Sequence, residues 1–327
     1  MRNKKDAIAS TPILGGETAG ASPQPLRTTA SALPLRTLAL VLLIAAAAPP
    51  ARILLREQAW TPPSPGRVEA LTQTQGECIT TATPEIEIGR ALFRTPVLIG
   101  GPAARAGLSC HACHTDGGAN THFMLPELTD RPGAADVTSE WSSHVRGDGV
   151  ANPRDIPDLA GAGARAAFGQ GREPSLERFM HGVVVEEFQG EEPPPAAFAA
   201  LVAYVRALDA AACPATPAPV SLASAAEDVR RTLAAAQHAD AATASLLLYA
   251  AQDQIGRVAE RLPPAAFKHE RRALAALARE LGGLRETPAA LGESGWRARF
   301  DGAIARIARR EDETYFNAET LRAALGD

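Results

Sequence analysis

The sequence has few cysteines, little net charge and no long apolar run, and these scarcities exclude several classes of protein. It holds four cysteines in 327 residues and a single Cys-x-x-Cys pair, which excludes a zinc site built from two such pairs. The formal net charge of −4 gives no reason to expect nucleic-acid binding. The apolar run at residues 38–48 is too short for a confident membrane span.

Residues 1–50 nevertheless carry the pattern of a targeting segment. Five basic residues precede the apolar run 38–48: Arg2, Lys4, Lys5, Arg27 and Arg36. Pro49 and Pro50 follow it, after small residues that suit cleavage. This arrangement predicts a signal peptide, and an uncleaved signal anchor holding the protein at the membrane is the alternative. In both cases the rest of the chain is exported, and we expect it in the periplasm.

The most informative feature is the run Cys110-His111-Ala112-Cys113-His114, which has the Cys-x-x-Cys-His spacing of c-type haem attachment. Two thiols on one helical turn can each add to a vinyl group of the porphyrin, and His114 then supplies the proximal nitrogen to the iron. A Cys-x-x-Cys redox pair usually lies near a βαβ pattern, and this sequence shows none. The box therefore predicts one covalent haem c, with His111 as a solvent-facing spacer.

The other two cysteines, Cys78 and Cys213, bracket the box almost symmetrically. In an oxidising compartment two remaining thiols tend to pair. We therefore expect a Cys78–Cys213 disulfide, with two unpaired cysteines as the alternative.

Linker-like stretches at residues 51–77 and 214–220 divide the exported part into a haem domain, 78–213, and a helical bundle of unknown role, 221–327. Apolar periodicity and capping residues predict helices at 84–94, at the box, and at 175–188, 195–209, 221–238, 241–261, 264–281, 296–310 and 318–325. Residues 115–171 are loop-rich. The expected fold class is all-α: a cytochrome c-like haem domain followed by an antiparallel helical bundle.

Two packing arrangements follow from these helices. We expect Gly89 and Phe93 to cross against Leu201 and Tyr204, with Gly89 letting the two backbones approach. The bundle core is expected to contain Leu233, Leu246, Leu247, Tyr249, Ile255, Leu262, Phe267, Leu274, Leu281, Trp296, Phe300, Ile304 and Ile307.

Five segments occur along residues 78–213 in a fixed order: 87–93 (EIGRALF), 108–114 (LSCHACH), 156–159 (IPDL), 174–177 (PSLE) and 200–208 (ALVAYVRAL). This order resembles a haem domain of the di-haem cytochrome c peroxidase superfamily. The resemblance implies an all-α cytochrome c domain with Cys110 and Cys113 as attachment sites and His114 as axial ligand. It does not imply peroxidase activity, because those enzymes use two haems in tandem and this chain has one box.

The sequence does not decide which residue is the sixth iron ligand. The family often places this ligand in the loop that corresponds to residues 166–171, and here that loop contains no strong ligand. Met180 and His144 are the leading candidates, His181 and Met124 are less favoured, and an open site is the remaining alternative.

Arginines near the box are candidates to pair with the haem propionates, because a guanidinium binds a carboxylate through two hydrogen bonds. They are Arg105, Arg146 and Arg154, and ordinary loop arginines are the alternative reading.

Three functions remain open. The first is one-electron transfer to a redox partner protein. Residues 78–213 hold 17 acidic and 10 basic residues, so the partner would bind them through a basic surface of its own. The alternative is that these acidic residues only face solvent. The second is a peroxidase-like enzyme with an open iron position, in which Glu186 or Glu187 moves protons. The third is a haem-based sensor whose bundle docks a partner.

Overall fold

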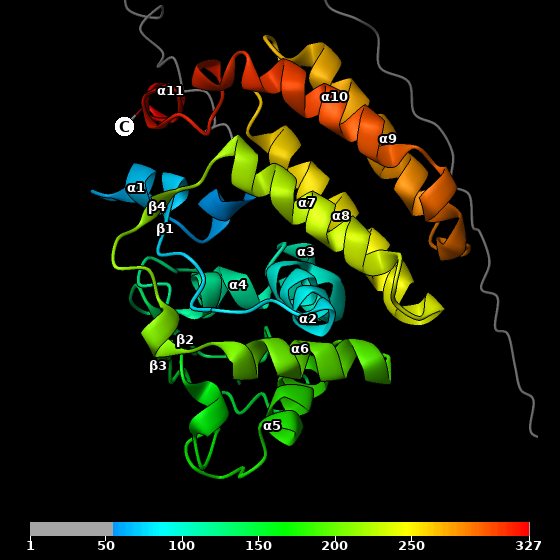
Figure 1. Ribbon diagram of the computed structural model, residues 1–327. Coiled ribbons are helices and arrows are strands. Elements are labelled where there is room, and N and C mark those ends of the chain that lie inside the picture. Colours follow the sequence, from blue (N-terminus) through cyan, green and yellow to red (C-terminus); the bar gives the residue numbers. More distant parts are fainter. Residues whose placement is uncertain (1–54, 327) are drawn as a thin grey trace, which may run out of the picture. The chain divides into compact units, whose positions relative to one another are not determined.

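The structure, a computed structural model, describes residues 55–326 and is mostly helical (Figure 1), as expected for an all-α protein. The targeting segment predicted at residues 1–50 lies outside the described residues. Within the described part of the chain, no helix has the length and apolar character needed to cross a membrane.

The elements follow the expected order closely. The helices are α1 (Arg67–Thr72), α2 (Pro84–Arg94), α3 (Gly101–Arg105), α4 (Cys110–Cys113), α5 (Leu176–Gly182), α6 (Pro195–Ala207), α7 (Leu222–Ala236), α8 (Ala241–Glu260), α9 (Lys268–Gly283), α10 (Trp296–Ala308) and α11 (Ala318–Leu325). Two short antiparallel pairs are present: β1 (Gln73–Thr74) with β4 (Ala218–Pro219), and β2 (Ala134–Ala135) with β3 (Arg154–Asp155).

Helix α2 has the bounds that its capping residues predict. The Thr83 hydroxyl accepts a hydrogen bond from the backbone N–H of Ile86, and Pro84 occupies the first helical position. The helix ends at Arg94 because Pro96 disfavours helical backbone at Thr95.

The expected crossing of α2 and α6 is confirmed. A Cβ atom added to Gly89 would lie 2.0 Å from the carbonyl oxygen of Ala200 and 2.7 Å from the Cβ of Tyr204. The rings of Phe93 and Tyr204 pack with their centroids 5.0 Å apart. Glycine at position 89 is therefore what permits this close helix pair, which forms one wall of the segment around the cysteine box.

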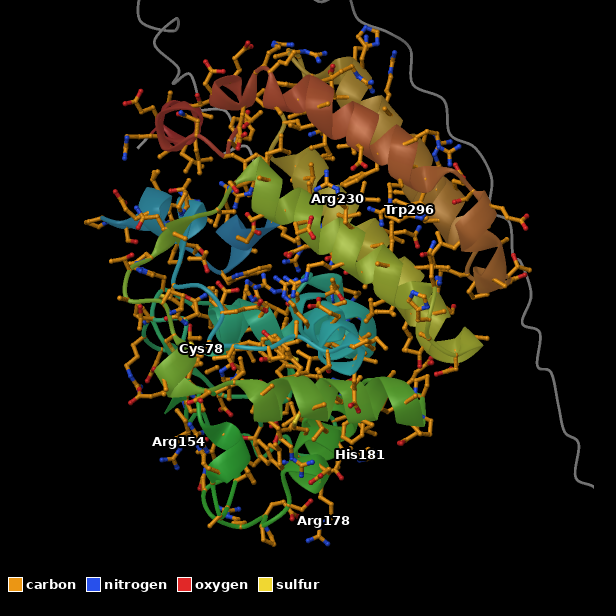
Figure 2. The ribbon with its side chains drawn as sticks, viewed as in Figure 1. Cys78, Arg154, Arg178, His181, Arg230 and Trp296 are labelled. Carbon is orange, nitrogen blue, oxygen red and sulfur yellow. A yellow bond between two sulfur atoms is a disulfide. The ribbon has the colours of Figure 1, made fainter. Side chains whose placement is uncertain are left out.

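Helices α7, α8, α9 and α10 contact one another in sequence, and α10 also returns to α7. Arg230 on α7 pairs with Asp301 on α10 at 2.8 Å (Figure 2). Helix α9 begins at Lys268 rather than at residue 264, because a turn follows Pro263 in which the Phe267 N–H donates to the Pro263 carbonyl.

Most of the residues expected in the bundle core are buried, with two differences. Leu246 is half-buried. Tyr249 is 43 % exposed, and the guanidinium of Arg285 lies 4.8 Å from its ring centroid, so an arginine rather than the core covers its face.

One hydrophobic cluster joins residues 78–213 to the bundle. It contains buried residues of α2 and α6 together with residues of α7 to α10. Figure 1 shows α2 between α6 and the α7–α8 pair. The ion pairs Arg90–Asp228, at 2.7 Å, and Arg231–Glu87 also connect α2 to α7. The bundle therefore packs directly on the helix that supports the cysteine box.

The two stretches expected to be linkers are partly structured. In residues 51–77, the side chains of Leu55, Trp60 and Leu71 are buried, and α1 lies within this range. In residues 214–220, strand β4 pairs with β1. Apolar side chains on both sides of Pro62-Pro63 pack against the rest of the protein and are buried there. The proline-rich composition, which suggested a linker, did not indicate this packing.

Cys78 and Cys213 form the expected disulfide, with Sγ atoms 2.09 Å apart and a sequence separation of 135 (Figure 2). The bond closes a loop of the chain that contains the cysteine box.

Candidate haem-attachment site

Helix α4 is a single turn made of Cys110 to Cys113, and the chain just after it satisfies its free carbonyl groups. The backbone N–H of His114 donates to the Cys110 carbonyl at 2.8 Å. Asn120 donates twice, from its backbone N–H to the Cys113 carbonyl at 2.9 Å and from its side-chain amide to the Ala112 carbonyl at 2.8 Å. A helix of one turn needs these hydrogen-bond donors from outside, because its last carbonyl groups find no N–H donor within the helix itself.

His114 lies at the end of this turn, and Nδ1 of its ring lies 3.0 Å from the carbonyl oxygen of Pro157. The loop that carries Pro157 is held on both sides. The Ile156 N–H donates to the Gly133 carbonyl at 2.9 Å, and the Leu159 N–H donates to the Gly117 carbonyl at 2.8 Å. The carbonyl of Pro157 is thus fixed against the histidine ring from a remote part of the chain.

A carbonyl only accepts hydrogen bonds, so Nδ1 of His114 must carry the proton. The lone pair of the neutral ring is then on Nε2, as a metal-binding imidazole requires. Burial lowers the pKa of His114 to about 4, so the ring is neutral near pH 7. The residue has the tautomer of a proximal iron ligand.

The thiols of Cys110 and Cys113 are both free, unlike the other two cysteines. Burial raises the pKa of Cys110 to about 11 and that of Cys113 to about 12. Reactive redox cysteines have lowered pKa values instead, so this environment does not favour a thiol–disulfide catalyst.

The two cysteines lie where two apolar clusters meet. Cys110 packs against the cluster of α2 and α6, whereas Cys113 packs against a second cluster that includes Leu108, Phe123 and Ile156. The surroundings of the box are therefore largely apolar, which suits a porphyrin. Within residues 55–326, no group of three or more His, Cys, Asp or Glu side chains is arranged to hold a metal ion.

The candidates for the sixth ligand lie in different environments. Met180 is half-buried on α5 and packs against the main core, and His144 is exposed in its loop. His181 pairs through Nε2 with Glu192 at 2.8 Å and contacts the ring of Phe198 edge-on (Figure 2).

Met124, the remaining candidate, is half-buried, and its backbone N–H donates to the Trp60 carbonyl. No hydrogen bond links His114 to any of the four candidates among the described residues. The alternatives for the sixth ligand therefore stay as the sequence left them, with Met180 and His144 leading, Met124 and an open site remaining, and His181 engaged with Glu192.

The residues proposed for propionate pairing and for proton transfer contact each other. Arg146 binds Glu186 at 2.8 Å and Glu187 at 2.5 Å, while Arg105 and Arg154 are exposed (Figure 2). Burial raises the pKa of Glu187. Arg146 thus pairs with one oxygen of each carboxylate.

His111 is not the solvent-facing spacer that the sequence suggested. It is half-buried, and its Nδ1 accepts a hydrogen bond from the backbone N–H of Asp116 at 3.1 Å. Burial, together with the nearby Arg94 and Arg257, holds the pKa of His111 well below its usual range. The reason for the difference is tertiary, because α2 and the bundle cover this side of α4.

Two residues of this site were not identified from the sequence, namely Pro157 and Asn120. Pro157 was noted only as part of the Ile-Pro-x-Leu segment, and no local pattern shows that its carbonyl faces a ring 43 residues earlier. For Asn120 the signal was present, because asparagine commonly caps nearby backbone groups.

The chain matches no protein-family model, and none of the curated proteins or solved structures compared with it shows similarity. The resemblance to the peroxidase superfamily thus depends on the short motifs quoted above.

Proposed function

We propose that this chain is an exported mono-haem c-type cytochrome that transfers single electrons. The observation that carries the proposal is the hydrogen bond from Nδ1 of His114 to the Pro157 carbonyl, beside the free thiols of Cys110 and Cys113. It leaves Nε2 of a fixed neutral ring for iron, next to two sulfur atoms for thioether bonds.

The residues present fit a covalent haem. Cys110 and Cys113 would hold it through their sulfur atoms, and His114 would bind the iron. When bound, haem supplies a one-electron Fe(III)/Fe(II) couple. The protein contributes the fixed ligand orientation and apolar surroundings, both of which tune that couple.

The peroxidase-like alternative is less well supported. It needs a proton-transfer group near an open iron position, and the two glutamates considered for that role, Glu186 and Glu187, are each ion-paired with Arg146. The excess of acidic residues over residues 78–213 would suit a redox partner with a basic surface, and a merely solvated acidic surface is the alternative.

The test is to record absorption and magnetic circular dichroism spectra of the matured, exported protein in both oxidation states. Six-coordinate, low-spin iron is the expected result for an electron carrier. A sulfur ligand lost in Met180→Ala identifies Met180, and a nitrogen ligand lost in His144→Ala identifies His144. Five-coordinate, high-spin iron in both states would contradict the carrier and favour an enzyme or a sensor.

A further inference from the structure

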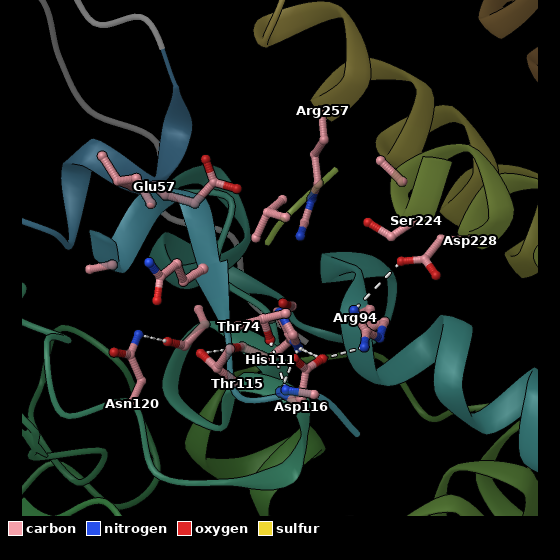
Figure 3. Close-up of a pocket in the computed structure, with 18 of the residues that line it drawn as sticks. Glu57, Thr74, Arg94, His111, Thr115, Asp116, Asn120, Ser224, Asp228 and Arg257 are labelled. Carbon is pink, nitrogen blue, oxygen red and sulfur yellow. Dashed lines mark hydrogen bonds and ion pairs between the residues drawn. The ribbon is translucent and has the colours of Figure 1, made fainter. Parts of the chain in front are cut away.

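A cavity of about 310 Å³, lined by both polar and apolar side chains, lies beside the cysteine box (Figure 3). Its walls come from α2, α4, α7, α8 and the segment around β1. His111 and Ala112 of α4 line it, whereas Cys110, Cys113 and His114 do not. Since a water molecule takes about 30 Å³ of liquid volume, the space suits a small molecule together with a few waters.

On one wall of the cavity, the acidic groups are already engaged. Glu77 and Asp228 bind Arg90, each at 2.7 Å, and Asp116 binds Arg94 (Figure 3). Three carboxylates thus face two guanidinium groups. Both oxygens of Glu77, both of Asp228 and one of Asp116 are occupied, which leaves this wall little capacity to bind a cationic ligand.

The facing wall is formed by α8, and it carries hydrogen-bond donors without a partner among the described residues. Arg257 pairs through Nε with Asp253 at 3.0 Å, but Asp253 also binds Arg56. The two terminal nitrogens of Arg257 make no hydrogen bond among the described residues, and Figure 3 shows the guanidinium pointing into the cavity.

Arg261 caps the C-terminal end of α8, directly after Glu260, and is 7 % exposed. Its guanidinium donates to the carbonyls of Leu71, at 2.8 Å, and Tyr315, at 3.1 Å, and forms no ion pair within the described chain. Glu57 lines the same cavity without an ion-pair contact to Arg261, and the charges of Glu57 and Glu260 only partly offset the lowering of the Arg261 pKa by burial. A buried cation held only by carbonyl groups is stabilised by a nearby anion.

His111 supplies a third donor from the opposite side. Because its Nδ1 accepts the Asp116 N–H, the proton of the neutral ring is on Nε2, which makes no hydrogen bond within the described chain. The hydrogen-bonding capacity left on Arg257 and His111 therefore consists of donors.

We propose that this cavity binds a small oxyanion, a carboxylate or a phosphate group, between Arg257, Arg261 and His111. The proposal goes beyond electron transfer and does not depend on bound haem. It gives the C-terminal bundle a role, because α8 and its C-cap residue contribute two of the three groups. The bound anion would contact the cysteine-box turn through His111.

Isothermal titration calorimetry of the full exported chain tests the site, with inorganic phosphate and succinate as probes at constant ionic strength. We expect one-to-one binding of at least one probe. Arg257→Gln should weaken it by about tenfold or more, because a charge-assisted contact is lost. Asp253→Asn should strengthen it, because Arg257 then loses its competing carboxylate.

Arg272→Gln is the matched control, since Arg272 is exposed on α9 with no ion pair among the described residues. It should leave binding unchanged. Should Arg257→Gln fail to fold, as judged by circular dichroism, His111→Phe tests the same site and should weaken binding without touching the α8 ion pairs. Absence of one-to-one binding by both probes up to about 10 mM, or equal losses in the site and control variants, would overturn the proposal. Preference for phosphate or for succinate identifies the anion class.

Discussion

The ring of His114 and the carbonyl group of Pro157, 43 residues apart, are joined by a 3.0 Å hydrogen bond. The cysteine box is a local motif, but the orientation of its histidine depends on this remote loop. Hydrogen bonds of this kind set both the tautomer and the basicity of a metal-binding imidazole.

Replacing Pro157 by glycine should loosen the loop and weaken the hydrogen bond, because glycine has far more backbone freedom. A less basic His114 stabilises ferric iron less, so the midpoint potential of the haem-loaded protein should rise. If the ferric state is destabilised tenfold relative to the ferrous state, the midpoint potential rises by about 59 mV. A potentiometric titration measures the shift. Pro126→Gly, at an exposed proline, is the control, and an equal shift there would contradict the role given to Pro157.

Glu77 should make stability depend on acid pH. Burial alone would raise its pKa, but Arg94, Arg90 and the Tyr204 hydroxyl outweigh it and lower the pKa from 4.5 to about 2. Its contribution is therefore present above about pH 5 and is lost as the pH falls toward 2.

Glu77→Gln should thus destabilise the protein by about 3 kcal/mol at pH 7, and the difference should shrink toward pH 2. Urea unfolding across this range measures it. Glu85→Gln, at an exposed position of α2, should change stability much less. A difference between Glu77→Gln and wild type that persists at pH 2 would argue against this ionisation.

Gly89→Ala should cost about 3 kcal/mol or more, because the new Cβ would lie 2.0 Å from the Ala200 carbonyl oxygen and force α2 and α6 apart. The same change at Gly283 meets no atom within 4 Å and should be neutral or stabilise by up to about 1 kcal/mol. Thermal unfolding of both variants provides the comparison. Equal stability of the two would show that the helices do not need the glycine.

Removing the Cys78–Cys213 bond in a Cys78→Ser/Cys213→Ser variant should lower stability by about 4–5 kcal/mol, because the bond closes a long loop in the unfolded chain. Guanidinium unfolding of this variant and of wild type measures the loss. A reductant should then destabilise wild type but leave the double variant unchanged. Identical midpoints for wild type and variant would rule out a stabilising disulfide.

Local signals in the sequence predicted much of this fold. The Thr83 cap and Pro84 predict the start of α2, and the leftover cysteines predict the disulfide. Contacts between distant segments carry no such signal. Nothing near His111 indicates that α8 faces it, and nothing near Tyr249 indicates that Arg285 covers its ring.

The central claim is that Cys110 and Cys113 hold one haem covalently. The direct measurement is the intact mass of the denatured protein, produced in cells that mature c-type cytochromes. Wild type and a Cys78→Ser/Cys213→Ser control should each carry the added mass of one haem, and Cys110→Ala/Cys113→Ala should carry none. Covalent haem retained in Cys110→Ala/Cys113→Ala, or missing from wild type, would contradict the account.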